Sequence, residues 1–109
     1  MKNYQKILNF NGFVLLPEIF ESSSIKRAKN GLWEVIKGNY ETGVEPENRF
    51  WNPGDNSKNI IKIDKPHLSN KALFDLITTK SFGRYIAKVT SSIKIQIWHT
   101  QAVWKPAGG

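Results

Sequence analysis

The longest stretch of the sequence that can form a β-strand reads Ile93-Lys94-Ile95-Gln96-Ile97-Trp98-His99-Thr100-Gln101-Ala102-Val103-Trp104. Successive side chains of a strand point to opposite faces, so two sets of residues share a face here. The first set comprises Ile93, Ile95, Ile97, His99, Gln101, Val103 and, just beyond, Lys105. The second set comprises Trp98, Ala102 and Trp104. Because both sets contain apolar side chains, the pattern predicts a long strand that is covered on both sides.

A strand of this length needs hydrogen-bonded neighbours along its edges. The preceding sequence offers only two short extended runs, Phe13–Leu16, which Pro17 closes, and Ile60–Ile63. The last residues, 106–109, read Pro-Ala-Gly-Gly, which is typical of a turn. We therefore expect residues 1–109 to form a single partial domain, truncated before its main sheet.

Four stretches show the apolar periodicity of amphipathic helices. The first is Tyr4–Phe10, and the others follow candidate N-caps at serines 22–24, Ser69 and Ser81. The apolar positions of these three helices are Ile25, Ala28, Leu32, Val35 and Ile36; Ala72, Leu73, Leu76 and Ile77; and Phe82, Tyr85, Ile86 and Val89. Together with the long strand they predict an α+β fold that is rich in helices. Trp98 and Trp104 are expected to pack against those helices, and Gly31 leaves room for a neighbouring element to approach.

A long loop connects the second helix to the second extended run. It covers Asn39–Asn59, after the helix stop signal Gly38-Asn39, and contains the turn sequence Asn-Pro-Gly-Asp. Phe50 and Trp51 indicate a loop that packs on the core, with a substrate lid as the less favoured interpretation. Loops of this length are usually functional or disordered, so we regard this one as a candidate determinant of substrate specificity.

The composition excludes several classes of protein. The chain has 109 residues, too few for more than one domain, and no cysteine, which excludes disulfides, thiolate metal sites and cysteine catalysis. Near its start, no apolar run is long enough for a signal peptide or a membrane span, so we expect a cytoplasmic protein without membrane contact. The net charge of +7 suits an anionic partner. However, only three of the 16 basic residues are arginines, which make the strongest contacts to phosphates and bases. The densest basic cluster, Lys26, Arg27 and Lys29, lies on a polar helix face. We therefore do not expect nucleic acid as the partner.

Few residues are placed to carry chemistry. His99, Gln101 and Lys105 form a polar row on one face of the long strand, where Lys105 suits a carboxylate and Gln101 an amide or carbonyl. The alternative is a strand that simply runs out toward solvent. His67 is interpreted as a surface or capping residue, and no catalytic triad, phosphate loop or dinucleotide motif is present.

Two motifs resemble the phytanoyl-CoA dioxygenase family. The segment Ile95–Pro106 is similar to the hydrophobic strand, ending in Lys-Pro, that precedes the family's H-x-D metal motif. Asn-Gly-Phe-Val-Leu-Leu-Pro at residues 11–17 resembles the family's opening strand, and Ile60–Leu76 fits more loosely. The resemblance implies a jelly roll (double-stranded β-helix) with outer helices, to which this chain contributes the helices and the first long strand.

The resemblance also implies chemistry. Members of the family are Fe(II)- and 2-oxoglutarate-dependent oxygenases, and Lys105 matches the lysine that contacts 2-oxoglutarate. His99 and Gln101 match positions on the same strand face that line the co-substrate site. The iron-binding H-x-D pair, the distal histidine and the arginine beyond it have no counterpart after Lys105. We therefore expect a full-length parent that hydroxylates a small molecule, and a 109-residue chain that is inactive alone and binds neither cofactor tightly.

A different class of function remains open. A small basic module that binds an anion or a partner protein, without enzymatic activity, would share this composition and charge. The two alternatives predict different behaviour of the isolated chain. A module should unfold cooperatively as a stable monomer, whereas a fragment should expose its long strand and self-associate.

Overall fold

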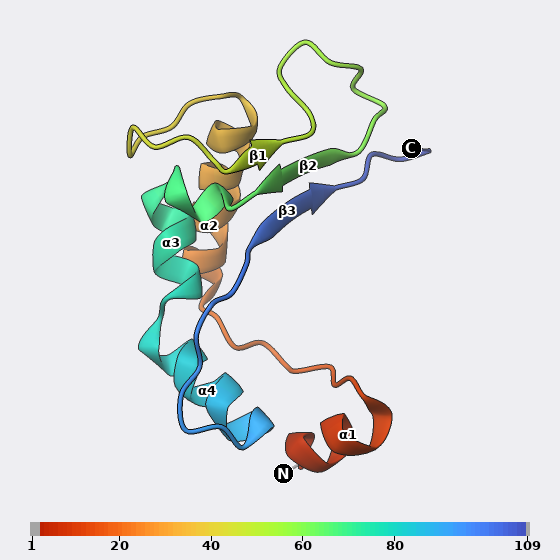
Figure 1. Cartoon of the computed structure of the whole chain (residues 1–109), viewed down its shortest axis with the longest axis vertical. Helices are drawn as coiled ribbons and strands as arrows, with labels where there is room; N and C mark the ends of the chain where they lie inside the picture. Colours follow the sequence, from red (N-terminus) through yellow and green to blue (C-terminus); the bar gives the residue numbers. More distant parts are fainter. Residues whose placement is uncertain (1–2, 109) are drawn as a thin grey trace.

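The structure is a computed structural model that describes residues 3–108. In that range it contains four α-helices, one short 3-10 helix and three β-strands. In chain order the elements are α1 (Tyr4–Asn11), α2 (Ser22–Ile36), β1 (Asn48–Arg49), β2 (Ile61–Asp64), η1 (Pro66–Leu68), α3 (Lys71–Ile77), α4 (Lys80–Thr90) and β3 (Gln101–Trp104). The strands form one antiparallel sheet in the order β1-β2-β3, so the fold is α+β, as expected (Figure 1).

The core lies between α2 and the inner face of the sheet. Ile61 and Ile63 of β2 pack against Val35 and Ile36 of α2, and all four side chains are buried. Partly buried residues surround this cluster: Leu32, Trp33, Tyr40, Trp51, Leu73 and Ala102. Removing this apolar surface from water is the main stabilising term. The apolar period predicted for α2 is thus confirmed in its second half.

Helix α3 approaches α2 closely because Gly31 has no side chain. A Cβ atom at Gly31 would lie 2.7 Å from Cγ of the buried Asn70. Asn70 in turn caps α3, since its Oδ1 accepts a hydrogen bond from the backbone N–H of Leu73 at 3.3 Å. The close approach expected at Gly31 is confirmed, and it fixes where α3 and the preceding η1 lie.

The long loop is held to α2 by Arg49. Its Nη1 and Nη2 donate to the backbone carbonyls of Val35 and Ile36 at 2.5 and 2.7 Å, and Nη1 also reaches the Tyr40 hydroxyl at 2.8 Å. A guanidinium at a helix C-terminus satisfies carbonyls that have no partner within the helix. The expectation that the loop at 39–59 packs on the core is confirmed for Trp51, whereas Phe50 is exposed. Within the loop, β1 also pairs with β2, which the sequence did not predict.

The opposite end of the molecule is packed much more loosely. Helix α1 meets α4 through the rings of Tyr4 and Tyr85, 6.5 Å apart, and Phe20 meets Phe82 at 4.9 Å. Within this end Val89 is the buried hydrophobic residue. Figure 1 shows α2, α3 and the sheet at one end of the molecule, and α1 and α4 at the other.

The extended run predicted at Ile60–Ile63 is confirmed as β2, one residue later in the chain, but the other two strand predictions are corrected by the structure. Phe13–Leu16 forms no strand, because no neighbouring segment in the described part of the chain offers it backbone partners. Only Gln101–Trp104 of the predicted long strand joins the sheet; residues 93–100 lie outside it. The strand is also covered on one side only. Trp104 packs edge-on against Trp33 of α2, with ring centroids 5.7 Å apart, as expected, whereas Trp98 is 93% exposed and does not pack on the helices.

Three helix starts also differ from the predicted serines. Glu21, Asn70 and Thr79 stand at the N-caps of α2, α3 and α4. At α3 the reason is visible, because Asn70 makes the capping bond while Ser69, one residue earlier, is fully buried. None of the helices in residues 3–108 is long and apolar enough to cross a membrane.

Candidate functional site

Asp64 brings together two of the three residues predicted to form a polar row. It is the last residue of β2, and the antiparallel register places it opposite Gln101 of β3. Gln101 Nε2 donates to Asp64 Oδ1 at 2.7 Å, and His99 Nε2 lies 3.6 Å from the same oxygen. The site therefore has a carboxylate at its centre.

The Asp64 carboxylate stays ionised at neutral pH. The hydrogen bond from Gln101 lowers its pKa below the ordinary value of 3.8, and His99, Asn48 and Lys62 act in the same direction, against the opposing effect of burial. The residue is largely buried. A fixed negative charge thus lies beside the two side chains that were expected to line an anion site.

Lys105 is not part of this cluster. It follows the end of β3, is exposed, and makes no side-chain hydrogen bond or ion pair with the described residues. Four residues of extended chain separate it from Gln101, which corresponds to about 13 Å. Between them, Val103 points to the same outer face of the sheet and is exposed.

His67 reaches the site from η1, where it is partly buried and lies in the last turn of that helix. Lys65 adopts a left-handed backbone conformation (φ 53°), which turns the chain sharply from β2 into η1. His67 Nδ1 then lies 2.5 Å from Thr100 Oγ1, and its ring stacks on Phe74 of α3 with centroids 6.2 Å apart. Burial lowers the pKa of His67, and the nearby Lys65 and His99 lower it further.

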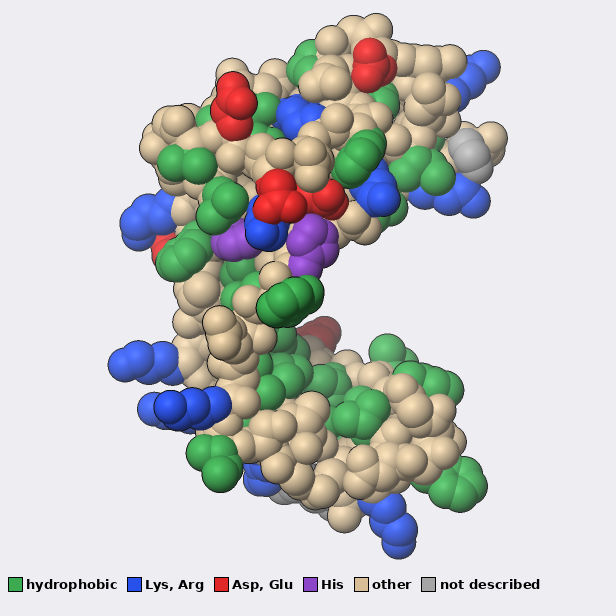
Figure 2. All heavy atoms as spheres, viewed as in Figure 1, with side chains coloured by type: hydrophobic (Ala, Val, Ile, Leu, Met, Phe, Trp, Pro, Cys, Tyr) green, Lys and Arg blue, Asp and Glu red, His purple; other side chains and the backbone are tan. Residues whose placement is uncertain are grey.

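A cavity of about 380 Å³ opens between η1, α3 and the segment that leads into β3. Its polar lining comes mainly from Lys65, His67 and His99. Lys65 Nζ is paired with Glu47 Oε2 at 2.5 Å. Figure 2 shows the two histidines near one another on one wall of a hollow in the molecule, with acidic and basic side chains beside them. The arrangement can bind a small polar group and exchange a proton with it.

Sequence reasoning missed Asp64 and Lys65 as parts of this site. Both residues lie within Ile60–Leu76, the segment whose resemblance to the family is the loosest. A polar residue directly after the apolar run Ile60–Ile63 was the available signal. The signal was insufficient because the register that sets Asp64 against Gln101 depends on which strands pair.

Among residues 3–108 no three His, Asp or Glu side chains are grouped so that they could hold a metal ion. No protein-family model matches the sequence, and comparison with curated proteins and with solved structures gave no significant match.

Proposed function

We propose that this chain forms the N-terminal, co-substrate-facing part of an Fe(II)- and 2-oxoglutarate-dependent dioxygenase domain that hydroxylates a small molecule. One observation carries the proposal. Residues 93–99 make no backbone hydrogen bond with the described residues, although they carry three alternating isoleucines. Ile93 is 99% and Trp98 93% exposed. Further strands of a larger sheet, as in a jelly roll, would give this segment backbone partners and cover its apolar side chains.

The overall dimensions support an incomplete domain. The radius of gyration is 15.9 Å, whereas a compact chain of this length has about 13 Å. The accessible surface is 8253 Å², against about 6,200 Å² for a compact folded chain of this size. The excess of about 2,000 Å² is comparable to the area of a large permanent interface. Further strands packed on the sheet would remove it from water.

The outer face of the sheet is the surface that such strands would cover. It bears Asp64 and Gln101, together with Lys62 and the exposed apolar residues Val103 and Phe50. In this proposal Lys105, which has no partner among the described residues, binds the distal carboxylate of 2-oxoglutarate. His99 and Gln101 line the same wall while they hold Asp64 in place. The described residues supply no iron ligand set, so the contribution of this chain is the wall of the site.

The test begins with the coding sequence that follows the codon for Gly109. We expect an open frame that encodes an H-x-D motif, a distal histidine and an arginine. The protein expressed from it should release succinate from 2-oxoglutarate when Fe(II) is supplied. Lys105→Ala should raise KM for 2-oxoglutarate about 10- to 100-fold, because a charge-assisted hydrogen bond is lost. Lys58→Ala, in the long loop, is the matched control. An immediate stop codon, or turnover that is insensitive to Lys105→Ala, would overturn the proposal.

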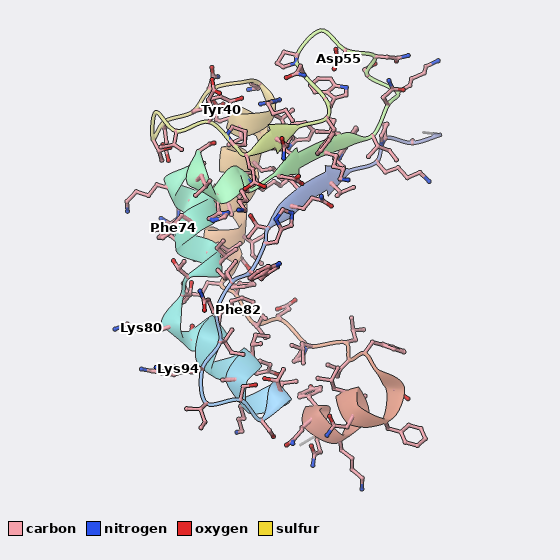
Figure 3. All side chains as sticks on the ribbon, viewed as in Figure 1. Tyr40, Asp55, Phe74, Lys80, Phe82 and Lys94 are labelled. Atoms are coloured by element: carbon pink, nitrogen blue, oxygen red, sulfur yellow. The ribbon has the colours of Figure 1, made fainter. Side chains whose placement is uncertain are left out.

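A second candidate function rests on the distribution of charge. Residues 76–109 carry five basic residues and no acidic one, so most of the net charge of +7 lies there. Lys80, Arg84 and Lys88 recur every four residues on α4, which places them along one face of the helix. All three are exposed, and Figure 3 shows Lys80 and Lys94 pointing out on the same side of the molecule. This surface suits an acidic partner protein, as a non-enzymatic binding module would need.

A charge-matched comparison tests this candidate. Replacing Lys80, Arg84 and Lys88 by glutamine should abolish binding to a polyglutamate peptide at low salt. The control replaces Lys26, Arg27 and Lys29 of α2, which removes the same charge from another exposed helix face. Equal losses in the two variants would show that only net charge acts and would reject a specific surface on α4.

A further inference from the structure

The cavity beside His67 has one apolar wall and one polar wall. Its volume of about 380 Å³ lies within the range of small-molecule sites. Leu68 of η1 and Phe74 of α3 form part of the apolar wall, and Ile97 and Trp98 complete it from the opposite segment. The cavity is therefore built by parts of the chain that are about 30 residues apart in sequence.

Aromatic surface dominates the apolar wall. The Phe74 ring lies nearly parallel to the His67 imidazole, with an interplanar angle of 20°. The Trp98 indole is almost entirely exposed and has no aromatic partner in the described chain. Leaving such a ring in water is unfavourable, and a planar ligand that stacked on it would bury both surfaces.

The basic groups of the polar wall are already paired with acidic side chains, except for His67. Lys65 faces Glu47, and His99 faces Asp64, so each of these basic groups already has one acidic partner. The partner of His67 is the hydroxyl of Thr100, which is uncharged. Among the groups that face the cavity, His67 is thus the one that can gain a proton and a new anionic partner together. One proton gained by His67 would balance a monoanion, whereas a dianion such as 2-oxoglutarate would keep one charge without a partner.

We propose that this cavity binds a small aromatic monocarboxylate, with its ring on the wall formed by Phe74 and Trp98 and its carboxylate against His67 and Lys65. If this ligand is the substrate of the enzyme, the inference specifies the substrate class of the proposed dioxygenase and depends on that proposal. The binding of the ligand itself depends only on the residues that line the cavity.

Three small probes test the two halves of the proposal. Phenylacetate carries both the ring and the charge, phenylacetamide lacks the charge, and acetate lacks the ring. We expect phenylacetate to bind with a Kd in the millimolar range, and the other two at least about 10-fold more weakly. Titrations followed by NMR should shift the His67 imidazole and Trp98 indole signals together. Phenylacetate should also raise the pKa of His67, because the carboxylate favours the protonated ring.

Variants at exposed positions test the site without disturbing the folded structure. Trp98→Ala should weaken phenylacetate binding at least about 5-fold, since the indole makes no packing contact that folding requires. Phe10→Ala, which removes a similarly exposed ring on α1 outside the cavity, should leave binding unchanged. The proposal is overturned if all three probes shift the signals equally, if none binds at millimolar concentration, or if Trp98→Ala has no effect. The measurement uses neither iron nor 2-oxoglutarate, so it fails or succeeds separately from the dioxygenase proposal.

Discussion

The two ends of the molecule treat their hydrophobic residues in opposite ways. We call α2, α3, η1 and the sheet the packed half, and α1, α4 and the segments 12–20 and 92–99 the open half. In the packed half, isoleucines at alternate positions of β2 are buried against α2. In the open half, the isoleucines at alternate positions of 93–97 lie at the surface. The same sequence pattern thus gives a core in one place and an exposed edge in the other.

The difference shows what decides the fate of an apolar strand. Residues 61–63 have backbone partners on both sides, in β1 and β3, and a helix over one face. Residues 93–99 have neither among the described residues. Burial therefore follows from the neighbours that a segment finds, and stability should be concentrated in the packed half.

The largest expected effect separates the two halves directly. Ile63→Ala removes a side chain that is 0% exposed and should lower the free energy of unfolding by about 2–5 kcal/mol. Ile93→Ala makes the same chemical change at an exposed position and should alter it by no more than about 0.5 kcal/mol. Urea unfolding followed by tryptophan fluorescence measures both. Similar losses in the two variants would mean that residue 93 is buried in solution and that the two halves do not differ as described.

A somewhat smaller effect is expected where the long loop is fastened to α2. Arg49→Met keeps the length of the side chain but removes the hydrogen bonds to the carbonyls of Val35 and Ile36. The loss should be about 3 kcal/mol, because donors that carry charge make the stronger bonds. Arg84→Met, on the exposed face of α4, is the matched control and should be nearly neutral. A neutral Arg49→Met would show that the loop packs through Trp51 and its neighbours alone.

Sequence reasoning succeeded where local pattern decides the structure. The helices α1 and α2 begin and end within about one residue of their predicted bounds, because their apolar period and glycine stop signals act locally. The close approach at Gly31 could be expected from one glycine in a helix interior. The predicted strand at 93–104 failed over most of its length, because period-2 alternation shows that a segment can pair but supplies no partner.

The candidate site shows the same division. The alternation of side chains correctly placed His99 and Gln101 close together. It could not supply Asp64 or His67, which come from segments more than 30 residues away and meet them only through strand register and the turn at Lys65. Alternation also places Lys105 on this face, but four residues of extended chain keep it about 13 Å from Gln101.

One glycine in each half allows the two halves to be compared through changes in stability of about 1 kcal/mol. Gly31→Ala should destabilise the protein by about 1–2 kcal/mol, since its Cβ would collide with the buried Asn70 of α3. Gly83→Ala, inside α4, meets no atom within 4 Å and should stabilise the protein by up to about 1 kcal/mol through helix propensity. Thermal unfolding shows whether each variant is more or less stable than the original protein, and the two changes should have opposite signs. A stabilising Gly31→Ala would show that α2 and α3 are not in close contact.

The smallest effect concerns protons at the edge of the packed half, where His67 and Asp64 lie. Because the pKa of His67 is lowered in the folded chain, the unfolded chain binds more protons as the pH falls through the ordinary value of 6.5. Folding stability should therefore be complete above this value and decline below it. Asp64 acts in a separate window: its lowered pKa contributes stability above 3.8, which is lost as the pH falls further.

Two variants, His67→Gln and Gln101→Leu, distinguish the pH range near 6.5 from the range below 3.8. His67→Gln should remove the slope of unfolding free energy near pH 6.5 and leave the acid limb unchanged. Gln101→Leu should raise the pKa of Asp64 and so weaken the acid limb alone, because the hydrogen bond from Gln101 is the main cause of that shift. Gln96→Leu, at an exposed position of the open half, should change neither. If Gln101→Leu leaves the pH profile intact, β3 does not hold Asp64 in solution, and this edge of the packed half is looser than its hydrogen bonds indicate.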